Sequence, residues 1–277
     1  MELNIKNFNL FYDTFQNINK MTKGVKIIFD RTGMKCSLRT ETKDESRLDV
    51  ISNVVTVDSD EPVEMCTKSL NVITQLLYRI IKAHAVKKGK NVQTPDFSDV
   101  HIEIKDQQIF VRSKLIKTSM YLVEEAALFV PGEFKHVLNP ITELSVSTDD
   151  LKEILASTIC FNDPDRLCIL LCHQEDMVRN NAYACLVDSN DPRSPTFYSK
   201  FGSILYGDLT QEIYVDIARI QCLTSFPVKE MKVVLNKEPC YVAKFSISED
   251  EYKTQYTITG KYVRKQLEVV GSNVKPN

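Results

Sequence analysis

Apolar and polar residues alternate along this chain with two different periods, and the periods predict which segments are strands and which are helices. The segments VKIIFD (25–30) and MKCSLRT (34–40) are short apolar runs on either side of a turn at 31–33 that contains Gly33, which predicts a β-hairpin. Between residues 67 and 83, apolar residues recur every three or four positions (Leu70, Ile73, Leu77 and Ile80). That spacing predicts an amphipathic helix.

The other elements of the first half follow from the same patterns. We expect a short strand in MELNIKN, a helix over about residues 8–20 capped by Asn7 or Asn9, and strands at 47–52 and 53–58. Three further strands are predicted at 100–106, 107–114 and 118–125. The first unit is therefore a strand, a helix, several strands, a second helix and three strands.

The second half repeats this order of elements. Ser147 or Thr148 is expected to cap a helix whose first turn carries Asp149 and Asp150, where the helix dipole favours acids. Strands, a short helix over 218–226 that stops at Pro227, and three closing strands follow. We predict an α+β chain of two similar domains, residues 1–125 and 145–277, joined by a connector over 126–144.

The predicted connector has no clean period and is rich in proline and apolar residues. Its apolar positions include Leu128, Phe129 and Val130. Two interpretations stay open: these side chains hold the connector against a sheet, or they form the wall of a groove for a partner peptide.

Charge is distributed unevenly along the chain. The formal net charge is -2, yet the stretch from Cys66 to Val92 has six Lys/Arg and no Asp or Glu. Helical spacing places part of this charge on one face, with Lys68, Asn71, Gln75, Arg79 and Lys82. A solvated helix face usually mixes both signs, so the missing acids favour a surface that meets a polyanion. The alternative is an ordinary solvated helix.

Composition excludes several classes of protein. With 277 residues and no apolar run of about 20, the chain is expected to form soluble domains without a membrane helix. The N-terminus lacks the pattern of a signal peptide, and the eight cysteines form no CxxC pair, so we expect a cytoplasmic protein with buried thiols, no metal and no cofactor. The four histidines are scattered and no nucleotide-binding, metalloprotease or hydrolase motif is present, so no enzyme is predicted.

Both halves resemble the DNA sliding clamp family, PCNA-like processivity factors, and most of all the clamps of T4-like bacteriophages. The resemblance is carried by FYDTFQNINK, VKIIFDRTGMKCSLR and CTKSLNVITQLLYRI in the first half, and by STDDLKEIL, EIYVDIARIQ, MKVVLNK and YVAKFSI in the second. It covers about residues 1–262. It implies a ring, usually of three subunits, with sheets outside and helices around a hole for duplex DNA. It also implies a polymerase and a clamp loader as partners.

The resemblance assigns residues to three surfaces. The DNA-lining set is Lys20, Lys68, Arg79, Lys82, Lys87, Lys88, Lys90, Lys152 and Arg219. The partner-peptide groove is Leu128, Phe129, Val130, Pro227, Tyr262 and Val263. The subunit interface pairs Met120, Tyr121, Leu122 and Val123 of one copy with Phe197, Tyr198 and Phe201 of the next.

Two other functions compete with this interpretation. A virion structural protein that assembles through sheet edges is also β-rich, although it does not need an acid-free helix. A monomeric DNA-binding accessory protein is the other alternative, and it would bind linear DNA without encircling it.

Overall fold

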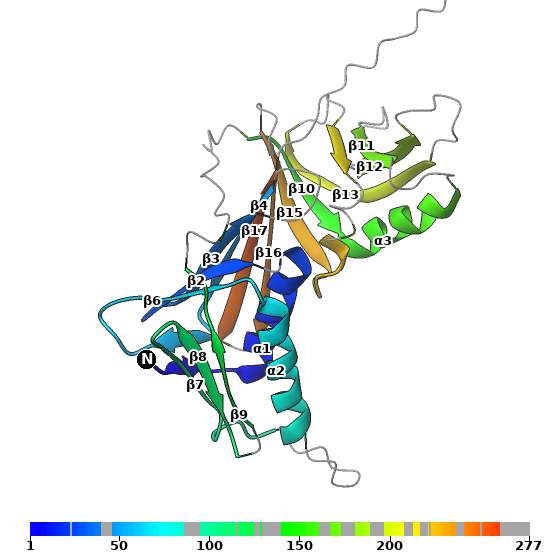
Figure 1. The fold of residues 1–277 in the computed structure, drawn as a ribbon. Coiled ribbons are helices and arrows are strands. Elements are labelled where there is room, and N and C mark those ends of the chain that lie inside the picture. The colour runs from blue at the N-terminus through cyan, green and yellow to red at the C-terminus, as the bar shows by residue number, and fades with distance from the viewer. Residues whose placement is uncertain are drawn as a thin grey trace, which may run out of the picture.

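A computed structural model of the chain shows helices on one side of a long antiparallel sheet (Figure 1). The structure describes residues 1–22, 24–39, 46–85, 95–114, 116–124, 128, 140–160, 167–172, 181–188, 197–207, 213–216, 221, 223–236, 241–249 and 251–260. All structural statements below concern these residues.

The first half has the predicted order of elements with one strand more. Its elements are β1 (Leu3–Ile5), α1 (Phe8–Met21), β2 (Val25–Asp30), β3 (Gly33–Arg39), β4 (Ser46–Ser52), β5 (Val55–Val57), β6 (Val63–Thr67), α2 (Leu70–His84), β7 (His101–Lys105), β8 (Gln108–Arg112) and β9 (Lys117–Tyr121). The strand β6 was not predicted from the sequence.

The second half follows the same course. Its elements are β10 (Pro140–Ser147), α3 (Thr148–Ala156), the 3-10 turn η2 (Ser157–Cys160), β11 (Leu167–Cys172), β12 (Asn181–Asp188), β13 (Phe197–Gly207), β14 (Ile213–Asp216), β15 (Glu230–Asn236), β16 (Tyr241–Glu249) and β17 (Tyr252–Gly260). Residues 140–144, which the sequence suggested were connector, belong to β10. In the predicted helix 218–226, the described residues Gln221, Leu223 and Thr224 are helical.

Local capping explains where two of the helices begin. The Asn7 side chain accepts a hydrogen bond from the backbone N–H of Leu10 at 3.0 Å, and Ser147 accepts one from Asp150 at 3.3 Å. Both caps satisfy backbone donors that a first turn leaves without helical partners. In α2 the residues Leu70, Ile73, Leu77 and Ile80 are buried, as their spacing predicted.

Strand order shows that the repeat predicted from the sequence is real. A 12-stranded sheet runs β14-β11-β12-β13-β10-β15-β16-β17-β4-β3-β2-β6. In the first half, β4 pairs with β3, and its continuation β5 pairs with β1, which bridges to β7 of the sheet β7-β8-β9. The first half therefore runs β6-β2-β3-β4/β5-β1-β7-β8-β9. The second half runs β14-β11-β12-β13-β10-β15-β16-β17, which is the same order.

The two halves are joined by pairing between β17 and β4. The register runs from Thr254 opposite Ser52 to Gly260 opposite Ser46. Helix α1 lies over this junction, where Thr14 Oγ1 is 3.2 Å from Thr254 Oγ1 and Asn17 donates to the Tyr256 hydroxyl at 3.2 Å. The junction thus makes one continuous sheet from both halves.

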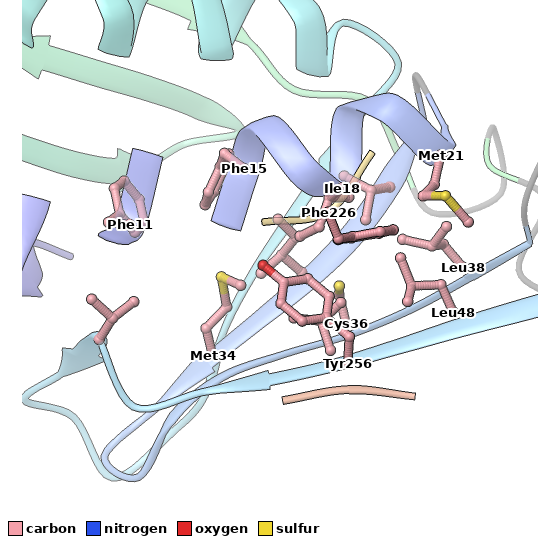
Figure 2. Close-up of a cluster of buried hydrophobic side chains, with 14 of the residues drawn as sticks. Phe11, Phe15, Ile18, Met21, Met34, Cys36, Leu38, Leu48, Phe226 and Tyr256 are labelled. Atoms are coloured by element: carbon pink, nitrogen blue, oxygen red, sulfur yellow. The ribbon is translucent and has the colours of Figure 1, made fainter. Parts of the chain in front are cut away.

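A hydrophobic cluster fills this junction. Figure 2 shows Phe15 and Ile18 of α1 close to Phe226 and Tyr256 of the second half. The Tyr256 ring stacks on Phe245 with centroids 5.0 Å apart, and its side chain is fully buried. Burial raises the pKa of Tyr256 to about 12, so its hydroxyl is neutral near neutral pH. Asn17 of α1, although polar, is buried against Tyr256.

One glycine permits the close approach of strands in each half. Gly33 has φ +149°, and a β-carbon there would lie 2.1 Å from the Ser52 carbonyl oxygen. Gly202 lies where β13 passes from β12 to β10, and a β-carbon there would lie 2.2 Å from the Ser145 oxygen. Any side chain at either position would force the strands apart.

Candidate functional site

The helices α1, α2 and α3 lie on the same side of the long sheet, with α1 and α2 packed side by side (Figure 1). Their inner faces fill the core, so their outer faces form a common surface. The charge of that surface is set by the exposed residues of the three helices.

The exposed face of α2 carries only positive charge. Lys68 just before the helix, and Arg79 and Lys82 within it, are exposed, as are Asn71 and Gln75 between them. Within the described part of the chain, these three cations form no ion pair. The predicted cationic face is therefore present and points away from the subunit's own core.

The end of α2 is held by a histidine. The two ring nitrogens of His84 lie 2.8 Å from the Ile80 carbonyl oxygen and 2.8 Å from Asp99 Oδ1. The ring therefore bridges a backbone carbonyl of α2 and the Asp99 carboxylate. The backbone N–H of Lys114, with the His84 contact, holds the pKa of Asp99 below its usual range. The contact between His84 and Asp99 links the C-terminal end of α2 to the residues that precede β7.

The α1 and α3 helices contribute much less positive charge. Lys20 is exposed, but its ammonium donates to the Ser225 carbonyl at 2.7 Å and to Asn17 Oδ1 at 3.1 Å. Lys152 forms an ion pair with Asp149 at 2.9 Å, which lowers the pKa of the Asp149 carboxyl. Glu153 is also exposed on α3, so that helix is acidic on balance. Lys87, Lys88, Lys90 and Arg219 lie outside the described residues.

Within the described residues, β9 and the first part of β13 each pair with another strand on one side only. Strand β9 pairs only with β8, and the Tyr121 side chain is 78% exposed. Residues 197–201 of β13 pair with β12 on one side, whereas β10 begins to pair only at Gly202. Met120 and Tyr121 therefore lie on an open edge, whereas the backbone N–H groups of Leu122 and Val123, beyond β9, donate to the carbonyl oxygens of Gln107 and Cys66. The Phe201 side chain is buried within its own chain.

A hollow of about 270 Å³ lies between α2 and the edge at β9. It is lined on the helix by Val72, Leu76 and Arg79, and on the strands by Thr118 and Met120. No local pattern in the sequence predicts this hollow, because the strands and the helix meet there only in three dimensions.

The predicted peptide groove is described only in part. Leu128 is half-buried beside Gly24, where a β-carbon would come within 3.3 Å of the Leu128 Cδ2. Pro227 is exposed next to the buried Phe226. Both residues lie near the C-terminal end of α1. Leu128 is next to Gly24, which follows the helix, and Pro227 is two residues from Ser225, whose carbonyl oxygen accepts a hydrogen bond from Lys20 of α1. Phe129, Val130, Tyr262 and Val263 lie outside the described residues.

Other kinds of site find little support in the described residues. No group of three or more His, Cys, Asp or Glu there is arranged to hold a metal ion. The free thiols of Cys36 and Cys66 are buried, and burial raises the pKa of Cys36. Among these residues, no helix combines the length and apolar character of a membrane span.

Paired topological repeats, a sheet on one side and helices on the other define the fold of the PCNA-type sliding clamps. The chain matches the structure of A. fulgidus PCNA with the C-terminal region of FEN-1 bound to it, at a TM-score of 0.65 and 10% identity, over 96% of this chain and 100% of that one. It also matches PCNA from Entamoeba histolytica at a TM-score of 0.63 and 9% identity, over 94% of this chain and 98% of that chain.

A third match is the PCNA2-PCNA3 complex from Sulfolobus tokodaii, at a TM-score of 0.55 and 11% identity, over 94% of this chain and 99% of that chain. Neither the scan against protein-family models nor the search of curated proteins gives a match. At such low identity the matches show the fold, and they confirm the predicted PCNA-like sliding clamp fold and the α+β class.

Proposed function

We propose that this protein is a DNA polymerase sliding clamp, a scaffold rather than an enzyme. In this proposal three copies form a ring around duplex DNA. The observation that carries it is the exposed, acid-free face of α2 on the helix side of a clamp fold. Duplex DNA has about one negative charge per 1.7 Å of axis, so such a face attracts phosphates without selecting a sequence. Lys68, Arg79 and Lys82 are its central residues.

The proposed ring closes by repeating a junction that the chain already makes internally. Because the two halves share one strand order, β9 corresponds to β17, and the first part of β13 corresponds to β4. Since β17 pairs with β4 inside the chain, we infer that β9 of one copy pairs antiparallel with residues 197–201 of the next. Met120 to Val123 then meet Phe197 and Tyr198, while Phe201 contributes backbone only.

The hollow beside β9 is large enough to receive side chains from a helix of the neighbouring copy. Inside the chain, α1 covers β17; at the proposed interface, the corresponding helix α3 covers β9. The end of α3 supports this docking, because the Ile159 side chain is 87% exposed. Glu153 of that helix is opposite in charge to Arg79 in the hollow. The interface therefore combines apolar burial with charge complementarity.

Polymerase and clamp loader are the proposed partners, each docking through a short peptide. The groove would comprise Leu128, Phe129, Val130, Pro227, Tyr262 and Val263. The A. fulgidus PCNA structure, in which a region of FEN-1 is bound, supports peptide docking on this fold. The buried thiols of Cys36 and Cys66 suit a cytoplasmic location, that of the host cell if the chain belongs to a T4-like bacteriophage.

Mass in solution and topology on DNA test the proposal together. Sedimentation at several micromolar concentrations should give a closed trimer. Clamps loaded on nicked circular DNA should remain bound until one cut makes the circle linear. A stable monomer, or retention that ignores the cut, contradicts the ring. A mass that grows without limit with concentration instead supports the open assembly of a virion structural protein.

A further inference from the structure

A half-buried tyrosine of α1 and an exposed tyrosine of α2 meet where the two helices run side by side. The Tyr12 ring of α1 and the Tyr78 ring of α2 have centroids 6.0 Å apart and planes 25° from parallel. The Tyr78 side chain is 44% exposed. Lys82, one turn further along α2, places its ammonium 4.6 Å from the centre of the Tyr78 ring. We call these three residues the tyrosine seam.

Tyr12 packs partly against the core, but the core does not require Tyr78. Phe11 and Phe15 of α1 and Leu77 and Ile80 of α2 are already buried beneath the two helices. The seam instead lies at the outer face, on the same side of α2 as Asn71 and Gln75. An aromatic pair on this face adds a flat apolar surface to a row of amide and cationic side chains.

The charge of the seam suits an anionic ligand. Burial, followed by the nearby Asp13, raises the pKa of Tyr12, so this phenol has no negative charge that would repel phosphate. Lys82 supplies a positive charge directly beside the Tyr78 ring. Asp13 is the exposed acid on the α1 side, and α2 has none.

Duplex DNA does not make use of an exposed aromatic ring on a wall that faces its backbone. In a duplex the faces of the bases are stacked on each other, and a sliding protein meets phosphates and sugars. Unpaired bases do expose their faces, and proteins that bind single strands combine cationic grooves with aromatic rings. In such proteins, loss of one stacking ring weakens binding about 5- to 150-fold.

We propose that the tyrosine seam binds single-stranded DNA, with an unpaired base stacked on Tyr78 and a phosphate on Lys82. The inference rests on the proposed function in one respect, because it assumes that the helix side of the clamp faces DNA. It adds a second mode of binding: the cations of α2 hold duplex by charge alone, and the seam holds an unpaired segment by stacking.

Binding by fluorescence anisotropy tests the seam with the full-length protein. The probes are a labelled thymidine oligonucleotide of about twelve residues, within the site size of single-strand binders, and a duplex of the same length. Tyr78→Leu should weaken single-strand binding about 10-fold and change duplex binding less than 2-fold. Tyr78→Phe keeps the ring and should bind like the wild type. Tyr206→Leu, which removes an exposed tyrosine of β13, should change neither.

Photocrosslinking identifies the contact directly. A single strand with 5-iodouracil in place of thymine should crosslink to Tyr78 or Tyr12, as mapped by mass spectrometry, and an intact duplex should not. Crosslinks confined to other tyrosines, or equal losses of both binding modes in Tyr78→Leu, overturn the seam. Salt-dependent duplex binding that survives such a result leaves the clamp proposal standing, whereas its absence contradicts the clamp proposal itself.

Discussion

The helices α2 and α3 occupy the same side of one sheet, yet their exposed faces have opposite charge. The α2 face carries Lys68, Arg79 and Lys82 without an acid. The α3 face carries Asp149 and Glu153, and Lys152 is paired with one of them. A repeated topology therefore fixes which face of a helix is exposed but not the charge on it. In the proposed ring, DNA is held mainly by the first half of each copy.

The halves also differ at their last strands. In the second half, β17 is covered by α1 and paired with β4, and its Tyr256 is fully buried. In the first half, β9 is unpaired on one side, with Thr118 exposed beside the hollow. One junction is thus complete within the chain, and the other needs a second copy.

The largest effect is expected from emptying the complete junction. Tyr256→Ala removes a fully buried ring that packs on Phe226 and Phe245, and it should lower the free energy of unfolding by about 4 kcal/mol. Urea unfolding followed by circular dichroism measures the change. The control Tyr206→Ala removes an exposed ring and should cost less than about 0.5 kcal/mol. Similar values for both variants would show that the halves do not depend on this junction.

The incomplete junction should be sensitive to charge. Thr118→Asp leaves the isolated chain folded, because Thr118 is exposed. In the ring it buries a carboxylate near the acidic α3 of the neighbour, which should weaken assembly by about 3 kcal/mol. Sedimentation should then show monomers. The control Gln255→Asp, at an exposed position of β17 outside the hollow, should stay trimeric, and a trimeric Thr118→Asp variant contradicts the docking of α3 in the hollow.

Reversing the charge of α2 should weaken DNA retention more than it weakens assembly. With Lys68 and Lys82 changed to Glu, and Arg79 kept because it lines the hollow of the proposed interface, two attractive phosphate contacts per copy become repulsive. Duplex binding should fall at least about 10-fold. The slope of log K against log salt concentration should become less negative by about 0.9 for each lost phosphate contact. Salt titrations of binding give both quantities. Unchanged binding by a trimeric variant would mean that DNA does not meet α2.

The smallest expected effect is a gain. Asp149→Asn with Glu153→Gln removes two acids from α3 and frees Lys152 from its ion pair. Duplex binding should strengthen by less than about 1 kcal/mol, because the charges are exposed and screened by salt. Since Glu153 also faces Arg79 in the proposed interface, sedimentation should accompany the binding measurement. Unchanged binding with an intact trimer would show that α3 lies away from DNA.

Local patterns in the sequence were sufficient for the helices and most strands. Helical spacing predicted that Leu70, Ile73, Leu77 and Ile80 are buried. It also predicted that Lys68, Arg79 and Lys82 are exposed, because both properties follow from the 3.6-residue period. Strands β6 and β10 were missed. Strand β10 begins at a proline and is defined by its pairing with β13 and β15, which lie far away in sequence.

The same reason limits what the sequence reveals of the site. Asn17 has the spacing of a polar surface residue, and only its contact with Tyr256 explains its burial. Phe201 sits in an edge strand, yet its side chain enters the core. Tyr12 and Tyr78 belong to different helices, so their stacking depends on how α1 and α2 pack.

The pairing of β17 with β4 also has a consequence for biosynthesis. Strand β4 emerges from the ribosome some 200 residues before its partner Thr254, which pairs opposite Ser52, has been made. Until translation reaches β17, the first half exposes a bare strand edge that invites wrong pairing. A chain truncated before β17 therefore never completes its sheet, and we expect proteases and chaperones to remove such fragments before they join an assembly.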